Sequence, residues 1–337
     1  MPQLLPWLRR FLRAGSDLDK IRRIARAMRP LVRDCPTRHA RLAAEAGVPD
    51  LIVRAGMLYV YPTYADFMRE AVAWSIRREN GIHWLELGPE ELRQREPMLD
   101  RRYGFGVVVD GSGQCRDPGG YVAALARHAQ ARGAALLRAN ATGFDIAGGR
   151  LRAVRTSGGD IACDRAVIAA GARAKMLARA AGDDVPLESE RGYHTMIAGA
   201  EAGPRHLTMP SDGKMVHSAM RCGLRVAGQV EFAGLDAAPD WRRADILRQH
   251  LLRSYPDLPR DLPAERVRTW MGHRPSLPDS LPCIGPASGC ADVIHAYGHG
   301  HIGLAAGPVT GRLVADLIGG LPPTIDPAPY RPQRFRG

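Results

Sequence analysis

The chain has 337 residues, enough to bury a large core and to form two domains, and its 45% hydrophobic and 24% charged residues are typical of a globular protein. The formal net charge of +12 raises the question of a nucleic-acid partner, but the basic residues are almost all arginines scattered among Ala, Gly and Pro, so we expect no nucleic-acid binding. The sequence contains no run of about 18 apolar residues, so no membrane-spanning helix is expected.

The cysteines show neither a C-x-x-C motif nor a paired Cys/His spacing; they are Cys35, Cys115, Cys163, Cys222, Cys283 and Cys290. This pattern argues against a disulfide framework and a zinc site, and favours a reducing, cytoplasmic setting. The N-terminal residues also lack the small-residue cleavage site of a signal peptide.

The first predicted element is an amphipathic helix within residues 4–13. Arginines fall on one side of it and three leucines on the other, Leu5, Leu8 and Leu12. Two interpretations stay open: an ordinary helix packed on a core, or a cationic face resting on anionic lipid at the inner face of a membrane. Because residues 17–46 continue as basic helical sequence, we expect an N-terminal helical segment over residues 1–47.

Short β-like runs and helices then alternate. The expected strands lie within 51–61, 82–85, 104–109, 134–138, 142–146 and 151–156, and the expected helices at 65–79 and 121–132. The last three strands would form an antiparallel meander. Tyr59 and Tyr61 share one face of their strand and either pack in a core or line a ligand cavity.

A fully apolar strand follows and ends in the small residues Ala170 and Gly171. Bare backbone at this turn would let a flat ligand lie close against the chain. A tight turn inside a core needs the same residues, so both interpretations remain open.

The stretch 293–318 combines a β-like run, a glycine-rich turn and an apolar-periodic helix. A helix N-terminus presents free N–H groups and a partial positive charge, so it can hold an anionic or electron-rich group. The candidate residues at this turn are Gly298, Gly300, His301, Ile302 and Gly303. A turn needed only for tight strand-to-helix packing is the alternative interpretation.

This turn also satisfies G-x-G-x-x-G, but we reject an NAD site. A dinucleotide fingerprint opens a βαβ unit with a second strand and an acidic residue about 20 residues on. Here Pro322 and Pro323 end the pattern soon after the helix. The pair His299 and His301 lacks a carboxylate or Cys partner nearby in sequence, so no metal is expected.

Five segments together resemble the D-amino-acid dehydrogenase branch of the FAD-dependent D-amino-acid oxidase superfamily. They are AVIAAGARAKML (166–177), PLESERGYHTMI (186–197), LRVAGQVEFAGLD (224–236), WMGHRPSLPDSLPCIGPA (270–287) and YGHGHIGLAAGPVTGRLVADLI (297–318). Their order and spacing agree with that family.

The resemblance implies an α/β (mixed α+β) fold of the FAD/NAD(P)-binding type found in that family, with an interleaved antiparallel-sheet substrate domain. The expected divisions are a substrate domain at 48–103 and 184–279, the remaining part of the FAD-binding domain at 104–183 and 280–320, and a C-terminal tail at 321–337.

The sequence departs from the family in lacking the first βαβ unit, whose G-x-G-x-x-G turn holds the ADP half of FAD. It begins at what resembles a segment downstream of that unit. A late start codon or a truncated, decayed copy would explain this, and a second polypeptide that supplies the unit is the other explanation. We expect the chain as written to bind FAD poorly.

The resemblance further implies oxidation of a D-amino acid, or of a cyclic relative such as D-proline or hydroxyproline, to an imino acid, with hydride transfer to N5 of FAD. Arg274 would bind the substrate carboxylate. The alternative interpretation is an ordinary surface or core-edge arginine that binds no ligand. Tyr193 and His194 would project toward the ring, with His194 either tuning substrate protonation or packing. The head of the last helix would stabilise negative charge on the N1–C2=O edge of the flavin.

The partners expected from the resemblance are a small amino-acid substrate and an electron acceptor. Dehydrogenases of the family pass electrons to membrane quinones and the oxidases use oxygen, and the basic N-terminal helix favours the dehydrogenase. The rival interpretations are a glycine or sarcosine oxidase-like enzyme and a non-catalytic remnant or partner-dependent subunit.

Overall fold

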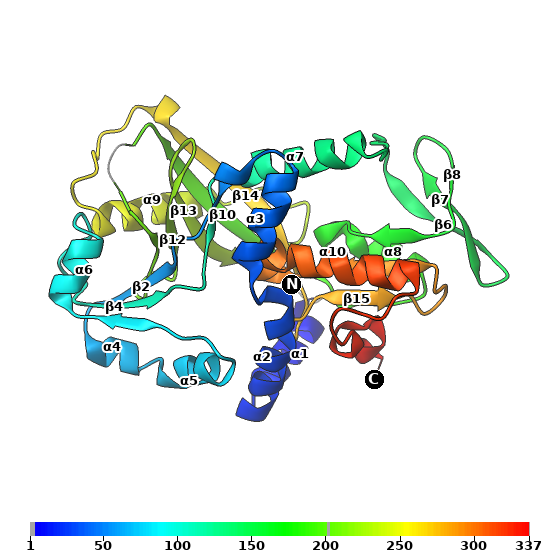
Figure 1. The fold of residues 1–337 in the computed structure, drawn as a ribbon, viewed down its shortest axis with the longest axis horizontal. Coiled ribbons are helices and arrows are strands. Elements are labelled where there is room, and N and C mark those ends of the chain that lie inside the picture. Colours follow the sequence, from blue (N-terminus) through cyan, green and yellow to red (C-terminus); the bar gives the residue numbers. More distant parts are fainter. Residues whose placement is uncertain (1–3, 201–202, 337) are drawn as a thin grey trace.

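The computed structural model describes residues 4–200 and 203–336, which form a mixed α/β fold around two principal sheets (Figure 1). The larger sheet lies on the left of the view and the smaller one on the right, with the N-terminal helices between them. The expectation of an α/β fold is confirmed.

The larger sheet has eight strands and is antiparallel except for one parallel pair, β11 and β2. In spatial order its strands are β14 (Val267–Ser276), β10 (Glu188–Ala198), β13 (Gly223–Glu231), β12 (Val216–Met220), β11 (Leu207–Pro210), β2 (Met57–Tyr61), β4 (Phe105–Val109) and β3 (Leu85–Leu87). The long strands β10 and β14 pair over ten residue positions.

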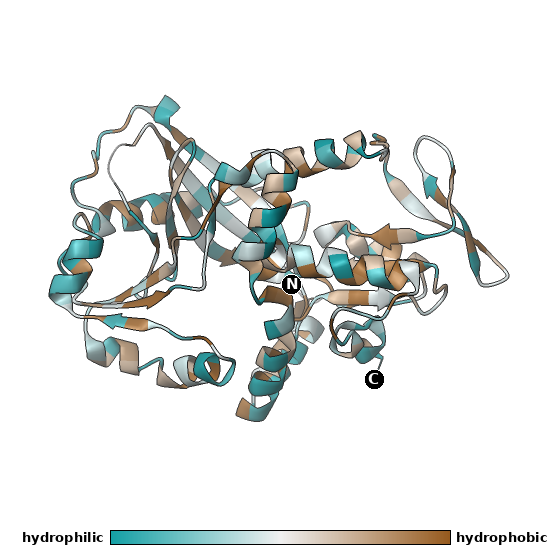
Figure 2. Ribbon diagram, in the orientation of Figure 1, coloured by the Kyte–Doolittle hydropathy of each residue, from teal (hydrophilic) through white to brown (hydrophobic). Residues whose placement is uncertain are grey.

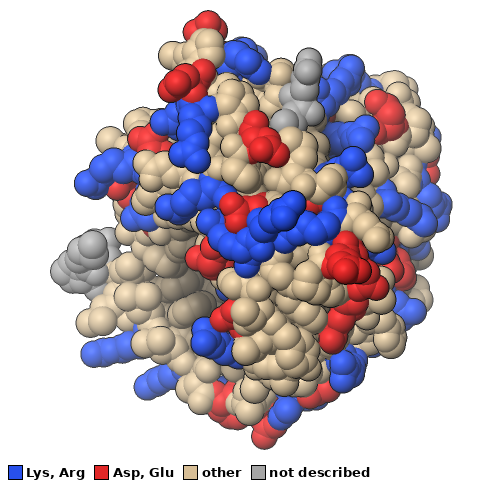
Figure 3. Space-filling model, turned by 90° about the vertical axis from the view of Figure 1, so that its left-hand side faces the viewer, with Lys and Arg blue, Asp and Glu red and all other residues tan. Residues whose placement is uncertain are grey.

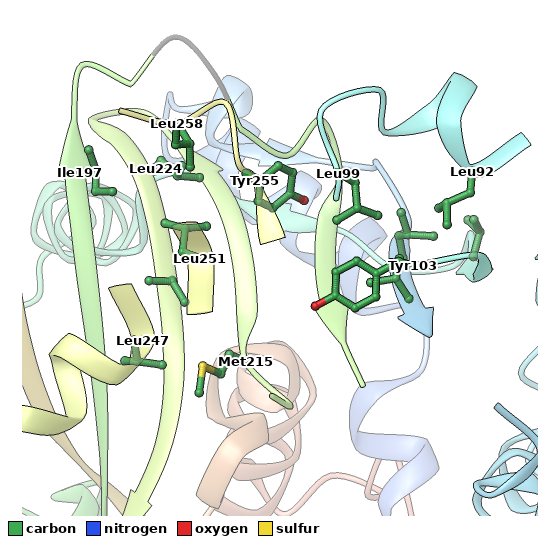
Figure 4. Packing of buried hydrophobic residues seen from close by; sticks show 14 of the residues in the cluster. Leu92, Leu99, Tyr103, Ile197, Met215, Leu224, Leu247, Leu251, Tyr255 and Leu258 are labelled. Atoms are coloured by element: carbon green, nitrogen blue, oxygen red, sulfur yellow. The ribbon is translucent and has the colours of Figure 1, made fainter. Parts of the chain in front are cut away.

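Helix α9 (Arg242–Ser254) covers one face of this sheet and forms the largest core with it. Figure 4 shows side chains of α9 pointing at those of the strands, among them Leu247 and Leu251 opposite Leu224 and Ile197. Apolar residues alternate along the strands, so only one face of each strand enters this core. The opposite face is free for other contacts.

The smaller sheet contains β15 (Cys283–Pro286), β16 (Val293–Tyr297) and β9 (Ala166–Ile168), and β16 runs parallel to β9. Helix α10 (Gly303–Gly319) packs on one face through residues such as Val309 and Leu313, and α8 (Ala174–Ala180) packs on the other. Figure 2 shows brown, hydrophobic colour on strands of both sheets.

Helix α10 bears on the expectation that the chain contains no membrane-spanning helix. Among the described residues, one helical stretch, Gly300–Gly319, is long and apolar enough to cross a membrane by length and composition. The helix packs on β15 and β16 through its buried side, and a core helix passes the same test. This stretch is therefore weak evidence for a membrane span.

The N-terminal segment forms three helices, α1 (Leu5–Ala14), α2 (Leu18–Val32) and α3 (Cys35–Glu45). The basic helical run expected to continue through 17–46 is interrupted at Asp34, whose φ of 56° is left-handed. The apolar side expected for α1 is largely uncovered in the described structure. Leu5 and Leu12 are exposed, whereas Trp7 is buried against Phe232 and stacks on the next turn of the helix.

The remaining regular elements are α4 (Tyr64–Met68), α5 (Ala71–Glu79), α6 (Pro89–Arg95), α7 (Pro118–Ala131), the pair β1 (Ile52–Val53) and β5 (Gln114–Cys115), and the meander β6 (Ala141–Ala147), β7 (Arg150–Thr156) and β8 (Ile161–Ala162). Short 3₁₀ turns lie at Pro49–Leu51, Gly171–Arg173, Ala264–Arg266, Gly300–Ile302, Ala328–Tyr330 and Pro332–Phe335.

Two local expectations differ from the fold. Residues 134–138 form no strand and are exposed, because apolar residues alone do not supply a pairing partner. The helix expected over 65–79 is divided into α4 and α5. Tyr59 and Tyr61 pack with Trp74 in an aromatic cluster, as the packing interpretation predicts.

The division into domains stays a prediction, but two strands pair across it, since β5 pairs with β1 and β4 with two further strands. The segment 104–183 was assigned to the FAD-binding part, yet β4 within it pairs with β2 and β3 of the larger sheet.

Candidate functional site

A cavity of about 560 Å³ lies between the head of α10, the ends of β10 and β14, and the inner side of α1. Its walls are mostly apolar with a few polar groups, which is typical of a site for a small organic ligand. It is lined by Trp7, Leu8, Phe11, Met28, Glu190, Val230, Phe232, Ser276, Leu277, Ser280, Gly298, His299, Gly300, His301 and Ile302. A hollow with largely uncharged walls is visible in the space-filling view of Figure 3, where acidic and basic residues are otherwise interspersed.

The glycine-rich turn forms one wall of this cavity. After β16 the chain turns at Gly298, whose φ is 85° and whose Cβ, if present, would lie 2.4 Å from Leu277. A 3₁₀ turn at Gly300–Ile302 then leads into α10 at Gly303. The helix has no side-chain cap and no acidic residue in its first turn, so its leading N–H groups are available to a ligand.

The two histidines of this turn differ. His299 Nε2 lies 2.9 Å from the hydroxyl of Thr310, and burial lowers the pKa of His299 to about 4, so it is neutral at neutral pH. His301 is more exposed and pairs with Glu190. His301 therefore connects the turn to the larger sheet.

Ala170 and Gly171 lie at the same edge of the smaller sheet as this turn. They follow β9, which runs parallel to β16, and the carboxyl ends of parallel strands meet at one edge of a sheet. Gly171 has a φ of 54° and begins a 3₁₀ turn. The structure thus brings this predicted pair to the same edge as Gly298, although neither residue is among those that line the cavity.

Arg274 lies on the face of the larger sheet that continues from the cavity. It pairs with Glu190 in the β10–β14 register, and its guanidinium extends over Gly192, where a Cβ would be 2.0 Å from Nη2. Nη1 donates a hydrogen bond to the carbonyl oxygen of Gln229 at 3.0 Å. Burial lowers the pKa of Arg274, and the nearby Glu190 carboxylate opposes this shift.

Glu190 is a site residue that the sequence analysis did not single out. Its carboxylate accepts a hydrogen bond from Ser276 Oγ at 2.7 Å, pairs with His301, and lies 3.7 Å from Nη1 of Arg274. Burial alone would raise the pKa of Glu190, but the contacts with His301, Ser276 and Arg274 together lower it. A charged residue inside a strand was the available signal, but its partners come from distant segments.

His194 and Tyr193 point to opposite faces of β10, because successive side chains alternate along a strand. His194 shares the face of Arg274 and stacks on Trp270 with ring centroids 5.1 Å apart. Burial, helped by the charge of Arg225, lowers the pKa of His194 to about 4.

Tyr193 faces α9 instead, which corrects the expectation that it projects toward the ring. Its hydroxyl donates to Glu231 at 2.6 Å and accepts a hydrogen bond from the N–H of Asp240 at 3.0 Å. Its ring lies in the core under α9. Tyr193 therefore fixes the sheet to the segment before that helix.

The residues present suit a flat ring with an electron-rich edge. Apolar side chains from α1, from the end of β13 and from the residue after β14 provide the walls, and the uncapped head of α10 provides N–H groups and positive potential at one end. Arg274 and its neighbours continue from the cavity along the sheet and could hold a carboxylate of a second molecule.

The family model described as FAD dependent oxidoreductase (DAO) matches residues 4–317. The chain belongs to this family. It is therefore an FAD-dependent oxidoreductase, and FAD is the cofactor that the family uses. The cavity at the head of α10 has the chemical character that the ring of FAD requires.

Curated relatives of this FAD-dependent oxidoreductase act on amino acids. A D-amino-acid oxidase of Bradyrhizobium diazoefficiens is 53% identical over 335 residues, which cover 99% of this chain and 79% of that protein. A D-amino acid dehydrogenase of Paramagnetospirillum magneticum is 31% identical and covers 96% of this chain and 77% of that protein. A glycine oxidase of Pseudomonas putida is 28% identical over 87% of this chain and 78% of that protein.

Solved structures support the same fold. Glycine oxidase from Geobacillus kaustophilus superposes with a TM-score of 0.77 at 23% identity, covering 93% of this chain and 82% of that one. L-Proline dehydrogenase from P. horikoshii gives a TM-score of 0.76 at 22% identity, covering 90% and 83%. At these identities the likeness concerns the fold alone.

Proposed function

We propose that this FAD-dependent oxidoreductase oxidises a D-amino acid to the corresponding imino acid, with Arg274 binding the substrate α-carboxylate. The single observation that carries the proposal is the position of Arg274 on the sheet face beside the cavity at the head of α10, with Glu190 paired to both Arg274 and His301. The names of the D-amino-acid oxidase and dehydrogenase relatives favour the D-configured substrate.

Each residue has a separate role in this proposal. The planar guanidinium of Arg274 suits bidentate contact with a carboxylate and orients the substrate Cα toward the cavity. Glu190 holds Arg274 and His301 in place, because it contacts both. Trp7 and Leu277 exclude water from the apolar part of the cavity.

Bound FAD supplies the two-electron acceptor for the substrate Cα hydrogen. On the protein side, the N–H groups at Gly300, His301 and Gly303 would hold the electron-rich edge of the ring, and Ala170 and Gly171 would lie at the neighbouring strand end. The N–H of Ile302 already donates to the carbonyl oxygen of His299 at 3.0 Å, so Ile302 would contribute its side chain to the cavity wall. Weak retention of FAD by residues 1–337 alone, and the supply of a dinucleotide-binding unit by a second polypeptide, stay predictions. The visible absorbance of the purified protein, with and without added FAD, tests them.

Anaerobic mixing with amino acids tests the function. Protein supplied with FAD should lose its flavin absorbance with a D-amino acid and keep it with the L-enantiomer, and the 2-oxo acid formed from the imino product should accumulate in equal amount. Loss of absorbance with the L-enantiomer at the same rate would contradict the proposal. A product that retains the amino group on Cα would also contradict it.

A glycine or sarcosine oxidase-like activity is the second candidate, favoured by the glycine oxidase relatives of two Pseudomonas species. Such substrates have no side chain, so they would not use the sheet face beyond Arg274. Faster flavin reduction by glycine or sarcosine than by any chiral D-amino acid would favour this alternative. A preference for D-proline or hydroxyproline rests on the sequence ERGYH at residues 190–194, which resembles that of family members associated with hydroxyproline-type substrates. These substrates can be compared in the same assay.

The electron acceptor and the surroundings of α1 form a further part of the proposal. Leu5, Leu12 and Leu18 are exposed on helices that also carry many arginines, which suits contact with an anionic membrane and its quinones. Co-sedimentation with vesicles that contain phosphatidylserine, compared with neutral vesicles, tests this contact. Equal recovery of the protein in the supernatant with both kinds of vesicle would contradict the membrane contact. A cytoplasmic oxygen-dependent oxidase would then be favoured.

A further inference from the structure

The face of the larger sheet beyond Arg274 carries a second arginine, Arg225. Arg225 on β13 pairs with Met196 of β10, two positions beyond His194 on the same face. No carboxylate lies within 4.0 Å of its guanidinium in residues 4–200 and 203–336, and its buried Nε has no hydrogen-bond partner there. A partly buried cation without a partner is costly, so such a group is a candidate ligand contact.

Two glycines between the two arginines allow neighbouring side chains to lie flat against the sheet. Gly192 and Gly272 are paired, and a Cβ at either position would collide with a side chain lying across it: Arg274 over Gly192 at 2.0 Å and Trp270 over Gly272 at 1.9 Å. The guanidinium and the indole therefore lie flat along the strands. His194 follows Gly192 on the same face of β10, and its ring stacks on Trp270.

The charge of this face is positive and almost uncompensated. Glu190 lies at the cavity end of this face and pairs with Arg274. Burial lowers the pKa of Arg225, and the nearby positive charge of Arg274 lowers it further. His194 between them is neutral at neutral pH. The exposed Arg268 stands on the edge strand opposite Met196 and adds positive potential.

We propose that Arg225 binds a carboxylate on the substrate side chain, so that the preferred substrates are D-amino acids with an acidic side chain. This inference rests on the proposed function, in which Arg274 holds the α-carboxylate. The two guanidiniums would then bind the two carboxylates of one dicarboxylic substrate, and His194 and Trp270 would contact the substrate between them. Charge-assisted hydrogen bonds at both ends favour such a substrate over a neutral one of the same size.

Calorimetric titration of the FAD-supplemented protein with matched acids tests the inference without turnover. Glutarate supplies two carboxylates, and valerate has the same chain length with one. Arg225→Met should weaken glutarate binding about tenfold to a hundredfold and leave valerate binding unchanged, because one charged hydrogen-bonding partner is lost. Arg274→Met should weaken both acids. Arg221→Met, at an exposed residue in the β12–β13 turn, is the matched control and should change neither.

The outcomes separate the two proposals. Equal affinity of wild type and Arg225→Met for glutarate, or equal weakening of both acids by Arg225→Met, would overturn the acidic-substrate inference. Unchanged valerate binding in Arg274→Met would instead contradict the proposed function. Steady-state kcat/KM with D-glutamate relative to D-glutamine gives a second readout, and this ratio should fall in Arg225→Met and stay constant in Arg221→Met.

Discussion

The Glu190 carboxylate lies 3.7 Å from the Arg274 guanidinium, across paired positions of β10 and β14. The same carboxylate contacts His301 at the turn before α10, so one acidic side chain joins the proposed substrate-binding arginine to the proposed flavin-binding helix. The two sheets of the molecule are thereby coupled at the site.

Glu190→Gln should remove a pH-dependent part of the stability. The folded state lowers the pKa of Glu190 below its ordinary 4.5, so its contribution is present above that pH and is lost as the pH falls through the lower, folded value. At neutral pH the variant should be less stable by about 1–3 kcal/mol, since the carboxylate has three charged or polar partners. Urea unfolding at several pH values measures the difference.

The difference between wild type and Glu190→Gln should shrink as the solution becomes more acidic than pH 4.5. Glu265→Gln changes an exposed carboxylate and is the control, for which a constant and small difference is expected. A Glu190→Gln difference that stays constant down to acid denaturation would contradict the assigned contacts.

Gly192→Ala should displace Arg274 without unfolding the sheet. The added methyl group would lie 2.0 Å from Nη2 of Arg274, and the flexible guanidinium can move away more easily than the strand. Binding of a monocarboxylate should weaken about tenfold, because the bidentate geometry is lost. Calorimetry measures the affinity, and Gly143→Ala, where a methyl group meets no atom within 4 Å, is the control. Full affinity in Gly192→Ala would show that the carboxylate binds elsewhere.

His194 should titrate well below the ordinary histidine range. Burial is the main cause of its pKa near 4, and the charge of Arg225 is the second cause. Because the folded pKa lies below 6.5, the unfolded chain binds more protons between these values, and stability falls as the pH drops through that window. Histidine NMR titrations of wild type and Arg225→Met should show the midpoint of His194 moving upward in the variant. A wild-type midpoint near 6.5 would contradict the packing against Trp270.

The sequence predicted the parts of the site that depend on local pattern. The apolar strand, the glycine turn and the apolar helix at 293–318 follow from spacing, and the segment resemblance led to the family that the comparisons confirm. The sequence could not show which face of β10 each residue occupies relative to its neighbours. Tyr193 was therefore placed toward the ring, and Glu190 was missed.

The remaining differences also arise from long-range packing. Trp7 rather than the leucines defines the buried side of α1, because Phe232 from a distant strand end supplies the contact. Apolar residues at 134–138 predicted a strand, but the segment has no pairing partner in the described structure. Local propensity indicates what an element could be, and tertiary contacts decide whether it forms.

Tyr193→Phe should affect stability and leave substrate binding unchanged. The variant loses the hydrogen bonds that the hydroxyl makes with Glu231 and with the N–H of Asp240, at a cost of about 1–3 kcal/mol. Because Tyr193 faces α9, KM for a D-amino acid should stay within about twofold of the wild-type value. Thermal unfolding and steady-state assays measure the two effects. A large rise in KM with unchanged stability would show that Tyr193 contacts the substrate and would contradict its placement under α9.

Ile302→Asp should make bound FAD harder to reduce. An acidic residue at the N-cap of α10 is compatible with the helix, since it accepts hydrogen bonds from the first turn. The same negative charge opposes the extra charge of the reduced ring, so the reduction potential should become more negative. Ile302→Asn has a similar shape without the charge and is the control. Equal potentials of the two variants, measured by dye equilibration, would argue against a ring at the head of α10.

The dependence of anaerobic flavin reduction on D-amino-acid concentration, compared between wild type and Arg274→Met at equal FAD content, tests the central claim most directly. We predict that the half-saturating concentration rises at least about tenfold in Arg274→Met, because the α-carboxylate loses its bidentate partner. An unchanged half-saturating concentration in Arg274→Met would contradict the account.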